Sequence, residues 1–439
     1  MKAAPFKRRF GAGGWCMLAL AILLTVTGCK ANTGEQAASP GSNTVSPSPN
    51  VSPSPSPTPS PSPSPSPAAS IPVQPVSGKP ATGSVPASET GTGTPFVLSS
   101  MSFINMKEGW SAAETKQGSD IWKTADEGAT WSKASIPGLI VRGIGFASAS
   151  TGWAVGKADC REQQGQRLCS KLQIVNSGNG GAAWSNQWQQ QVKDVNLYTD
   201  DKIFPVSDKL VYAIAGPGML RTTDGGKQWN AIDFHVGPFI PEEASFLPDG
   251  KNGWVLGRAG KGCKPEEREA RDQCAVTVVS TSDGGATWKL DWSPEDSNNM
   301  RTVGISFIDA KQGWLMVLSL DTLQSSTLGT TDGGAHWTKL SEMRGARPYT
   351  RGLQFVSAKI GFVPLSAGAG PIGGGLAVTK DGGKSFESKV TPGQEWSFEQ
   401  LQFFSEKSGW VRVGDPSKGD YLMETTDGGN TWKPHKPQL

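Results

Sequence analysis

The sequence predicts an all-β chain whose folded part is a seven-bladed β-propeller of four-stranded antiparallel blades, preceded by a disordered Ser/Pro-rich linker. Two observations carry this prediction. The first is composition: 439 residues include 55 Gly, 32 Pro and 16 Trp but only 18% charged residues, which favours short strands and tight turns over helical bundles. The second is a pair of motifs, each of which recurs seven times after residue 95.

Residues 1–28 have the layout of a secretory signal. Three basic residues at positions 7–9 precede an apolar run over residues 15–24, which is shorter than the roughly 20 residues of a membrane-spanning helix. The run leads into Val26-Thr27-Gly28-Cys29, which resembles the lipobox of bacterial lipoproteins. The resemblance implies that Cys29 is lipidated and anchors an extracytoplasmic protein to the cell membrane. An ordinary signal with a chance cysteine is the alternative.

Residues 29–94 form the linker. They are rich in Ser, Pro, Thr, Ala and Gly, and residues 46–67 are almost strict Ser-Pro alternation. Such a chain has little apolar surface to bury and favours extended polyproline II. We expect it to be a disordered stalk that holds the propeller away from the membrane, rather than a ligand for a proline-recognition domain.

The region 95–439 repeats one unit seven times. Each copy begins with a Phe followed seven or eight residues later by an aromatic residue, usually in Gly-Trp. Each copy ends in a variant of Thr-x-Asp-Gly-Gly-x-Thr-Trp. The spacing between the central acidic or amide residues, 45 to 59 residues, suits a four-stranded sheet with its turns. Those central residues are Asp126, Asn179, Asp224, Asp283, Asp332, Asp381 and Asp427.

The motifs also assign the strands. The Phe segment is the inner strand and the Gly-Trp segment the second. The Asp-Gly-Gly turn joins the third strand to the fourth, because Gly tolerates positive φ and the Asp side chain can bond the turn's own backbone. The motif Trp, for example Trp337, is expected to be buried between sheets. Because the chain starts with a first strand and ends with a fourth, the first and last blades are expected to meet by packing alone.

The second motif resembles the Asp-box, or BNR, repeat of sialidases, sortilin and xyloglucanases. Together with Phe-x5-Gly-Trp it resembles the propeller family of photosystem II stability and assembly factors. The resemblance covers residues 95–439 and implies a propeller that holds a partner protein, with the boxes serving structural roles at the blade periphery. More distantly, the sialidase resemblance implies a carbohydrate-active or glycan-binding propeller as the alternative.

Four cysteines in the propeller form two local pairs, Cys160 with Cys169 and Cys263 with Cys274. Each pair brackets a polar, charged insertion between the second and third strands. Outside the cytoplasm, such pairs predict disulfides. A metal site would need closer Cys spacing and nearby histidines, so no metal and no cofactor are predicted.

Catalysis is not predicted. A sialidase needs three arginines around a Tyr-Glu pair, and the chain has only four Tyr, of which Tyr349 alone is flanked by arginines. Other glycosidases need two facing carboxylates, whereas the neighbours Glu242 and Glu243 should point to opposite faces of a strand.

A candidate binding ring is predicted from one sequence position that recurs at the same distance from the inner-strand Phe. Four residues before the inner-strand Phe, five blades carry a charged residue, while the other two carry Ser99 and Val303, with Arg301 two positions before the latter. Equal offsets place these side chains at one mouth of the central channel, although strand entries are often polar without binding anything. The candidate ring is Arg142, Asp200, Glu242, Arg301, Arg351 and Glu399.

The sequence therefore predicts a monomeric, non-catalytic binding or scaffold protein. The expected partner is an envelope protein, with a glycan as the alternative. Nucleic acid is not expected, because residues 29–439 hold 38 basic and 39 acidic residues and so offer no excess positive charge.

Overall fold

The computed structural model describes the backbone of residues 74–75 and then residues 97–197, 201–260, 263, 274–294, 297, 299–344, 352–366, 374–390, 396–415 and 419–437. The signal segment, Cys29 and nearly all of the linker, as well as Asp200 and Arg351 of the predicted ring, lie outside these residues. None of the described segments is a helix with the length and apolar character needed to cross a membrane.

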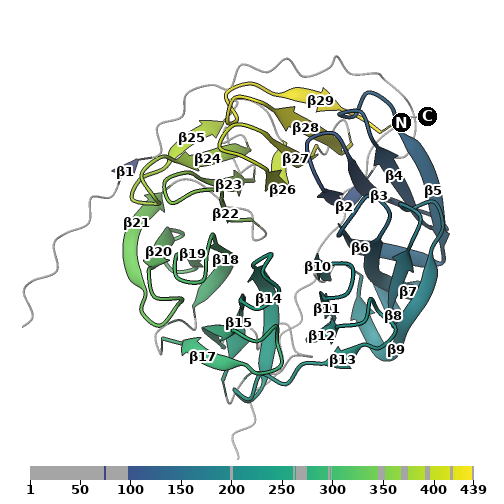
Figure 1. Cartoon of the computed structure of the whole chain (residues 1–439), viewed down its shortest axis with the longest axis horizontal. Coiled ribbons are helices and arrows are strands. Elements are labelled where there is room, and N and C mark those ends of the chain that lie inside the picture. Colours follow the sequence, from purple (N-terminus) through teal and green to yellow (C-terminus); the bar gives the residue numbers. More distant parts are fainter. Residues whose placement is uncertain are drawn as a thin grey trace, which may run out of the picture. The chain divides into compact units, whose positions relative to one another are not determined.

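Seven four-stranded antiparallel sheets form the seven predicted blades and surround one axis (Figure 1). The inner strands are β2 (Leu98–Phe103), β6 (Leu139–Phe146), β10 (Lys202–Pro205), β14 (Phe239–Phe246), β18 (Met300–Phe307), β22 (Gln354–Phe355) and β26 (Ser397–Phe403). The second strands are β3 (Gly109–Thr115), β7 (Gly152–Gln163), β11 (Val211–Ala215), β15 (Gly253–Ala259), β19 (Gly313–Ser319), β23 (Gly361–Leu365) and β27 (Gly409–Gly414).

The third and fourth strands complete each blade in chain order. The third strands are β4 (Gly118–Thr124), β8 (Gln166–Ser177), β12 (Gly218–Thr222), β16 (Ala275–Thr281), β20 (Ser325–Thr330), β24 (Gly375–Thr379) and β28 (Tyr421–Thr425). The outer strands are β5 (Ser132–Pro137), β9 (Ser185–Asn196), β13 (Asn230–Ala231), β17 (Lys289–Trp292), β21 (Thr338–Arg344), β25 (Glu387–Val390) and β29 (Lys433–His435). In addition β1 (Gln74–Pro75) pairs in parallel with β21.

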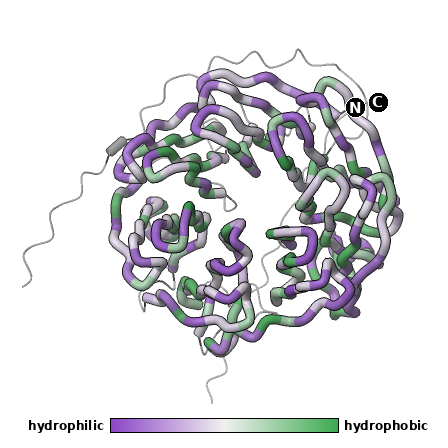
Figure 2. Tube along the Cα trace, in the orientation of Figure 1, coloured by the Kyte–Doolittle hydropathy of each residue, from purple (hydrophilic) through white to green (hydrophobic). Residues whose placement is uncertain are grey.

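Stacked aromatic rings join neighbouring blades. The second-strand aromatic of one blade stacks on the inner-strand Phe of the next, as Trp314 does on Phe355 with ring centroids 3.8 Å apart. Six of the seven junctions have such a pair, with centroids 3.6 to 4.4 Å apart. The hydrophobic positions therefore occur in every blade instead of gathering on one side (Figure 2), and the repeat's two aromatic positions build the interface between blades.

Two tryptophans of the second motif, Trp184 and Trp337, touch these pairs edge-on. Trp337 meets the ring of Phe307 at an interplanar angle of 86°, but it is only half-buried, less than the sequence predicted. Trp131 and Trp184 cover their own turns by donating Nε1–H to the carbonyls of Gly128 and Gly181. The most buried tryptophans are instead those of the second strands, such as Trp110 and Trp153, which are 0% exposed.

The residue just before the inner-strand Phe adds a hydrogen bond at five junctions. Its side chain accepts the backbone N–H of the next blade's Phe, as the Oγ of Ser306 does from Phe355 at 2.9 Å. The acceptors are Ser102, Ser245, Ser306, Gln354 and Gln402. These bonds run around the axis and satisfy an inner-strand group that has no partner in its own sheet.

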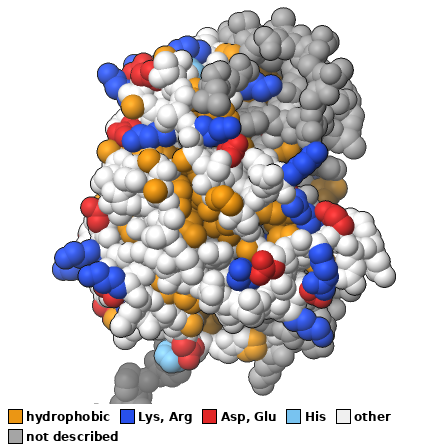
Figure 3. Space-filling view, turned by 90° about the vertical axis from the view of Figure 1, so that its right-hand side faces the viewer, with side chains coloured by type: hydrophobic (Ala, Val, Ile, Leu, Met, Phe, Trp, Pro, Cys, Tyr) orange, Lys and Arg blue, Asp and Glu red, His pale blue; other side chains and the backbone are white. Residues whose placement is uncertain are grey.

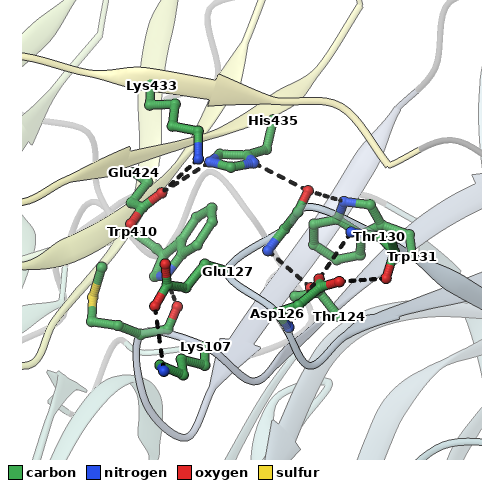
Figure 4. A network of polar contacts seen from close by, with 12 residues as sticks. Lys107, Thr124, Asp126, Glu127, Thr130, Trp131, Trp410, Glu424, Lys433 and His435 are labelled. Atoms are coloured by element: carbon green, nitrogen blue, oxygen red, sulfur yellow. Dashed lines mark hydrogen bonds and ion pairs between the residues drawn. The ribbon is translucent and has the colours of Figure 1, made fainter.

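The first and last blades meet through hydrogen bonds as well as packing, which corrects the expectation of packing alone. Among the described residues no strand is shared between them, but the amides of Gln400 and Gln402 bond the backbone of β2. On the outer side, His435 bonds Glu424 in its own blade and contacts the carbonyl of Gly128 in blade one (Figure 4). Side chains therefore close the ring in place of a shared sheet.

Candidate functional site in the central channel

A cavity of about 510 Å³ lies on the axis and is lined by residues of all seven inner strands and by Arg412 of β27. Its charged lining residues have both signs. Arg142, Lys202 and Arg412 are basic, and Asp201, Glu243 and Glu399 are acidic. A mixed-charge channel is therefore present, but its membership differs from the predicted ring.

The offset of four residues before Phe coincides with a β-bulge. In β2, β6, β14, β18 and β26 the register skips one residue, and the skipped residues are Ser99, Arg142, Glu242, Val303 and Glu399. A bulge leaves its extra residue out of the ladder and re-aims its side chain. The repeated charged position thus marks a repeated backbone irregularity.

The predicted ring residues differ in where their side chains lie. Arg142 and Glu399 line the cavity together with Ser99. Glu242 turns sideways, where its carboxylate accepts from the Nε of Arg258 at 3.1 Å and from the hydroxyl of Thr302 in the next blade. Arg301 is exposed on β18. Of the four ring residues that the structure describes, Arg142 and Glu399 line the cavity and Glu242 and Arg301 do not.

Charged residues that the prediction omitted hold blades two, three and four together. Lys157 of β7 and Asp201, which precedes β10, form an ion pair in which both side chains are fully buried. Lys202 of β10 bonds the carboxylate of Glu243 at 2.6 Å and the carbonyl of Glu242. Glu242 and Glu243 thus contact opposite neighbouring blades, as expected for adjacent strand residues.

These two ion pairs lie at the junctions that lack the circumferential side-chain bond. The residue before Phe is Gly145 in blade two and Ile203 in blade three, and neither side chain can accept a hydrogen bond. A buried charge is retained only when it is paired. We infer that the two ion pairs link these blades in place of the hydrogen bond that a Ser or Gln side chain makes at the other junctions.

At the first-to-last junction, Arg412 is the central group. Its guanidinium lies 2.6 Å from Glu399, 3.7 Å from Asp420 and 2.6 Å from the carbonyl of Leu98. Asp420 accepts the backbone N–H of Leu98 at 2.9 Å. Burial raises the pKa of Asp420 to about 6, and the nearby Arg412 only partly offsets that effect.

The seven turns between third and fourth strands, called here the Asp turns, share one hydrogen-bond pattern. In the turn of Asp332, the Thr330 hydroxyl donates to the carboxylate at 2.8 Å, and the backbone N–H of His336 donates to it at 3.0 Å. These bonds hold the pKa of Asp332 well below its usual range. In blade two, Asn179 makes the same contacts. We propose a structural role for all seven residues, because their hydrogen bonds are used within the turn.

The two cysteine pairs form disulfides. Cys160 and Cys169 lie opposite each other in β7 and β8, with an S–S distance of 2.06 Å. Cys263 and Cys274 are bonded at 1.97 Å. The first pair links two of the three 12-residue strands of blade two. Arg167 of this blade forms an ion pair with Glu114 of blade one.

Figure 3 shows that the side of the molecule carrying β5 and β9 has charged groups mainly at its margins and hydrophobic groups near its centre.

Within the part of the chain that the structure describes, no group of three or more His, Cys, Asp or Glu side chains is arranged to hold a metal ion.

Comparisons with known proteins support the fold. No protein-family model and no curated protein matches the chain. A solved structure of YCF48 bound to a D1 peptide is 19% identical and covers 75% of this chain and 93% of its own, with a TM-score of 0.49. An ulvan lyase, a polysaccharide lyase bound to its glycan, is 9% identical and covers 79% and 96%, with a TM-score of 0.50. A puromycin-hydrolysing peptidase of Mycobacterium tuberculosis is 10% identical, with a TM-score of 0.50, and this chain spans about half of its length. At such identities the likeness concerns the propeller architecture alone.

Proposed function

We propose that this chain is a non-catalytic, lipid-anchored extracytoplasmic propeller that binds a protein partner at its central channel. The observation that carries the proposal is the cavity lining. Basic and acidic side chains of blades two, three, four and seven line this axial cavity, and complementary charges of this kind can fix the register of a protein partner. The two disulfides indicate an extracytoplasmic location.

The carboxylates in the cavity support binding over hydrolysis. Asp201, Glu243 and Glu399 each lie within ion-pair distance of a lysine or arginine of the same or the adjacent blade. A glycosidase needs one carboxyl group as proton donor and a second facing it across the bond. Here each carboxylate is paired with a lysine or arginine side chain. We propose that these ion pairs hold the blades together and help to recognise the partner.

Arg142 is the best residue with which to test the proposal, because it lines the cavity from a bulge in β6. In affinity capture from an envelope extract, the full chain should retain a specific protein, and Arg142→Glu should lose it. The matched control is Lys384→Glu, the same charge change at an exposed Asp-turn residue of blade six. Both variants should keep the wild-type circular dichroism spectrum and melting temperature. Equal capture by Arg142→Glu and wild type would refute binding at the channel, and retention of a glycan with no protein would favour the carbohydrate alternative.

A further inference from the structure

A second, smaller cavity of about 270 Å³ lies away from the axis, between the outer parts of blades three and four. Its lining residues include Arg221 of β12, Asn230 of β13, Asp233 in the loop that follows, and Trp288 just before β17. This volume is below the range of sites for drug-sized ligands and suits a small group.

The short outer strand of blade three opens this pocket. β13 has only two residues, whereas β9 has twelve and β21 has seven. After Ala231 the chain leaves the sheet and turns at His235, whose φ is +56° and whose backbone N–H is held by Asp233 at 2.8 Å. The buried Phe234 packs against Trp288 with ring centroids 5.0 Å apart. The loop therefore has a defined conformation and forms one wall.

The same blade departs from the repeat in sequence. Its second-strand aromatic is Tyr212 where most blades have Trp, and the residue before the Asp-turn Thr is Arg221. The corresponding residues of the other blades are Lys123, Asn176, Ser280, Gly329, Val378 and Glu424. Burial raises the pKa of Tyr212 to about 12, while the positive charge of Arg221 acts against this rise. Arg221 is thus held beside a buried phenol.

Two N–H donors at the pocket lack acceptors. The Nε of Arg221 and the Nε1 of Trp288 are both buried, and neither has a hydrogen-bond partner among the described residues. A buried donor without a hydrogen-bond acceptor destabilises the folded protein by about 1–3 kcal/mol, and a charged donor by more. A ligand that offers two acceptor atoms would satisfy both donors.

We propose that this pocket binds a carboxylate group of a small ligand, with its oxygens accepting from Arg221 and Trp288. A carboxylate has two acceptor oxygens in the geometry that an arginine matches. A monoanion fits better than a dianionic phosphate, because the lining holds one basic residue, Arg221, beside one acidic residue, Asp233. The carboxylate can come from a sugar acid or from the end of a peptide, and the experiment below separates the two.

The test uses the full chain labelled with 5-fluorotryptophan, in which Trp288→Phe assigns the Trp288 fluorine resonance. The probes are matched pairs: glucuronate with glucose, and N-acetylglycine with its amide. Inorganic phosphate is a fifth probe. We expect the Trp288 signal to shift saturably with at least one carboxylate and with neither neutral twin. The carboxylate that acts identifies the source as a sugar acid or a peptide end.

Arg221→Gln should weaken that response at least tenfold, whereas the control Lys227→Gln, at an exposed residue of the same Asp turn, should leave it unchanged. An equal response to a neutral twin, a tighter response to phosphate, or no response to any carboxylate would overturn the proposal. These comparisons on the wild-type chain decide the matter even if Arg221→Gln does not fold.

Discussion

At the scale of single residues, two tryptophans of blade five have the same side chain in different surroundings. Trp314 is 3% exposed, stacks on Phe355 and donates to the carbonyl of Gly382 in the next blade. Trp337 is half-buried, and its Nε1 has no partner among the described residues. The second-strand tryptophan therefore stabilises the fold more than the motif tryptophan.

Replacing each tryptophan by alanine should show this difference. Trp314→Ala should lower the free energy of unfolding by about 3–5 kcal/mol, the range of a large buried aromatic, and Trp337→Ala by about half as much. Urea denaturation followed by circular dichroism measures both changes. Equal losses would contradict the greater contribution assigned to Trp314 by its burial and its stacking on Phe355.

Asp420 should make part of the stability depend on pH. Burial raises its pKa in the folded state to about 6, above the unfolded value near 4. The folded state therefore binds more protons than the unfolded state between these values, and Asp420 stabilises the protein as the pH falls from 7 to 5. The gain should be about 1 kcal/mol relative to Asp420→Asn, from the proton linkage of one such group.

Denaturation of wild type and Asp420→Asn at pH 5, 6 and 7 measures this effect. The Asp turns act in the opposite direction, because their carboxylates have lowered pKa values, so their contribution falls only as the pH drops below 4. A difference between wild type and variant that is constant from pH 5 to pH 7 would contradict the assignment to Asp420.

At the scale of strands and blades, the junction between the last and first blades depends on glutamine side chains. Gln402 both accepts the N–H of Phe103 at 2.8 Å and donates to its carbonyl, while Ser102 makes one comparable bond from blade one to blade two. Because Gln402 makes two such hydrogen bonds and Ser102 makes one, we expect Gln402 to contribute more to stability.

Gln402→Ala should cost about 2–3 kcal/mol, because it leaves two backbone groups of an inner strand without partners. The matched variant Ser102→Ala should cost about 1 kcal/mol. Thermal unfolding of both variants, with the wild type as reference, gives the order. If Ser102→Ala were the more damaging, the closure would depend on the aromatic stack of Phe103 and Trp410 instead.

The strands and their order were predictable from the sequence, because the two motifs mark the same positions in every blade. The side chain before Phe was equally visible in the sequence as Ser or Gln in five repeats, and it would have predicted the bonds around the axis. The bulges were not predictable, because an extra residue such as Glu242 looks like a normal continuation of the strand. The pair Lys157–Asp201 spans 44 positions, and only the finished fold brings its members together.

At the scale of the whole molecule, the proposed anchor makes a separate prediction. Cys29→Ala should move the protein from the membrane fraction to the soluble extracytoplasmic fraction, because a lipidated cysteine would be lost while the propeller stays intact. Cell fractionation and labelling with a radioactive fatty acid measure the change. A Cys16→Ala variant serves as control and should remain in the membrane fraction. Retention of Cys29→Ala in the membrane fraction would argue against this anchor.

The four antiparallel strands of each blade are consecutive in the chain, although β1 also pairs with the outer strand of blade five, and among the described residues no strand is exchanged between the last blade and the first. The cyclic order of the blades is therefore indifferent to where the polypeptide starts. A circularly permuted chain, cut in the connection between blades three and four and joined from blade seven to blade one, would contain the same seven sheets and the same seven junctions. The propeller architecture therefore does not depend on which blade boundary the chain is opened at.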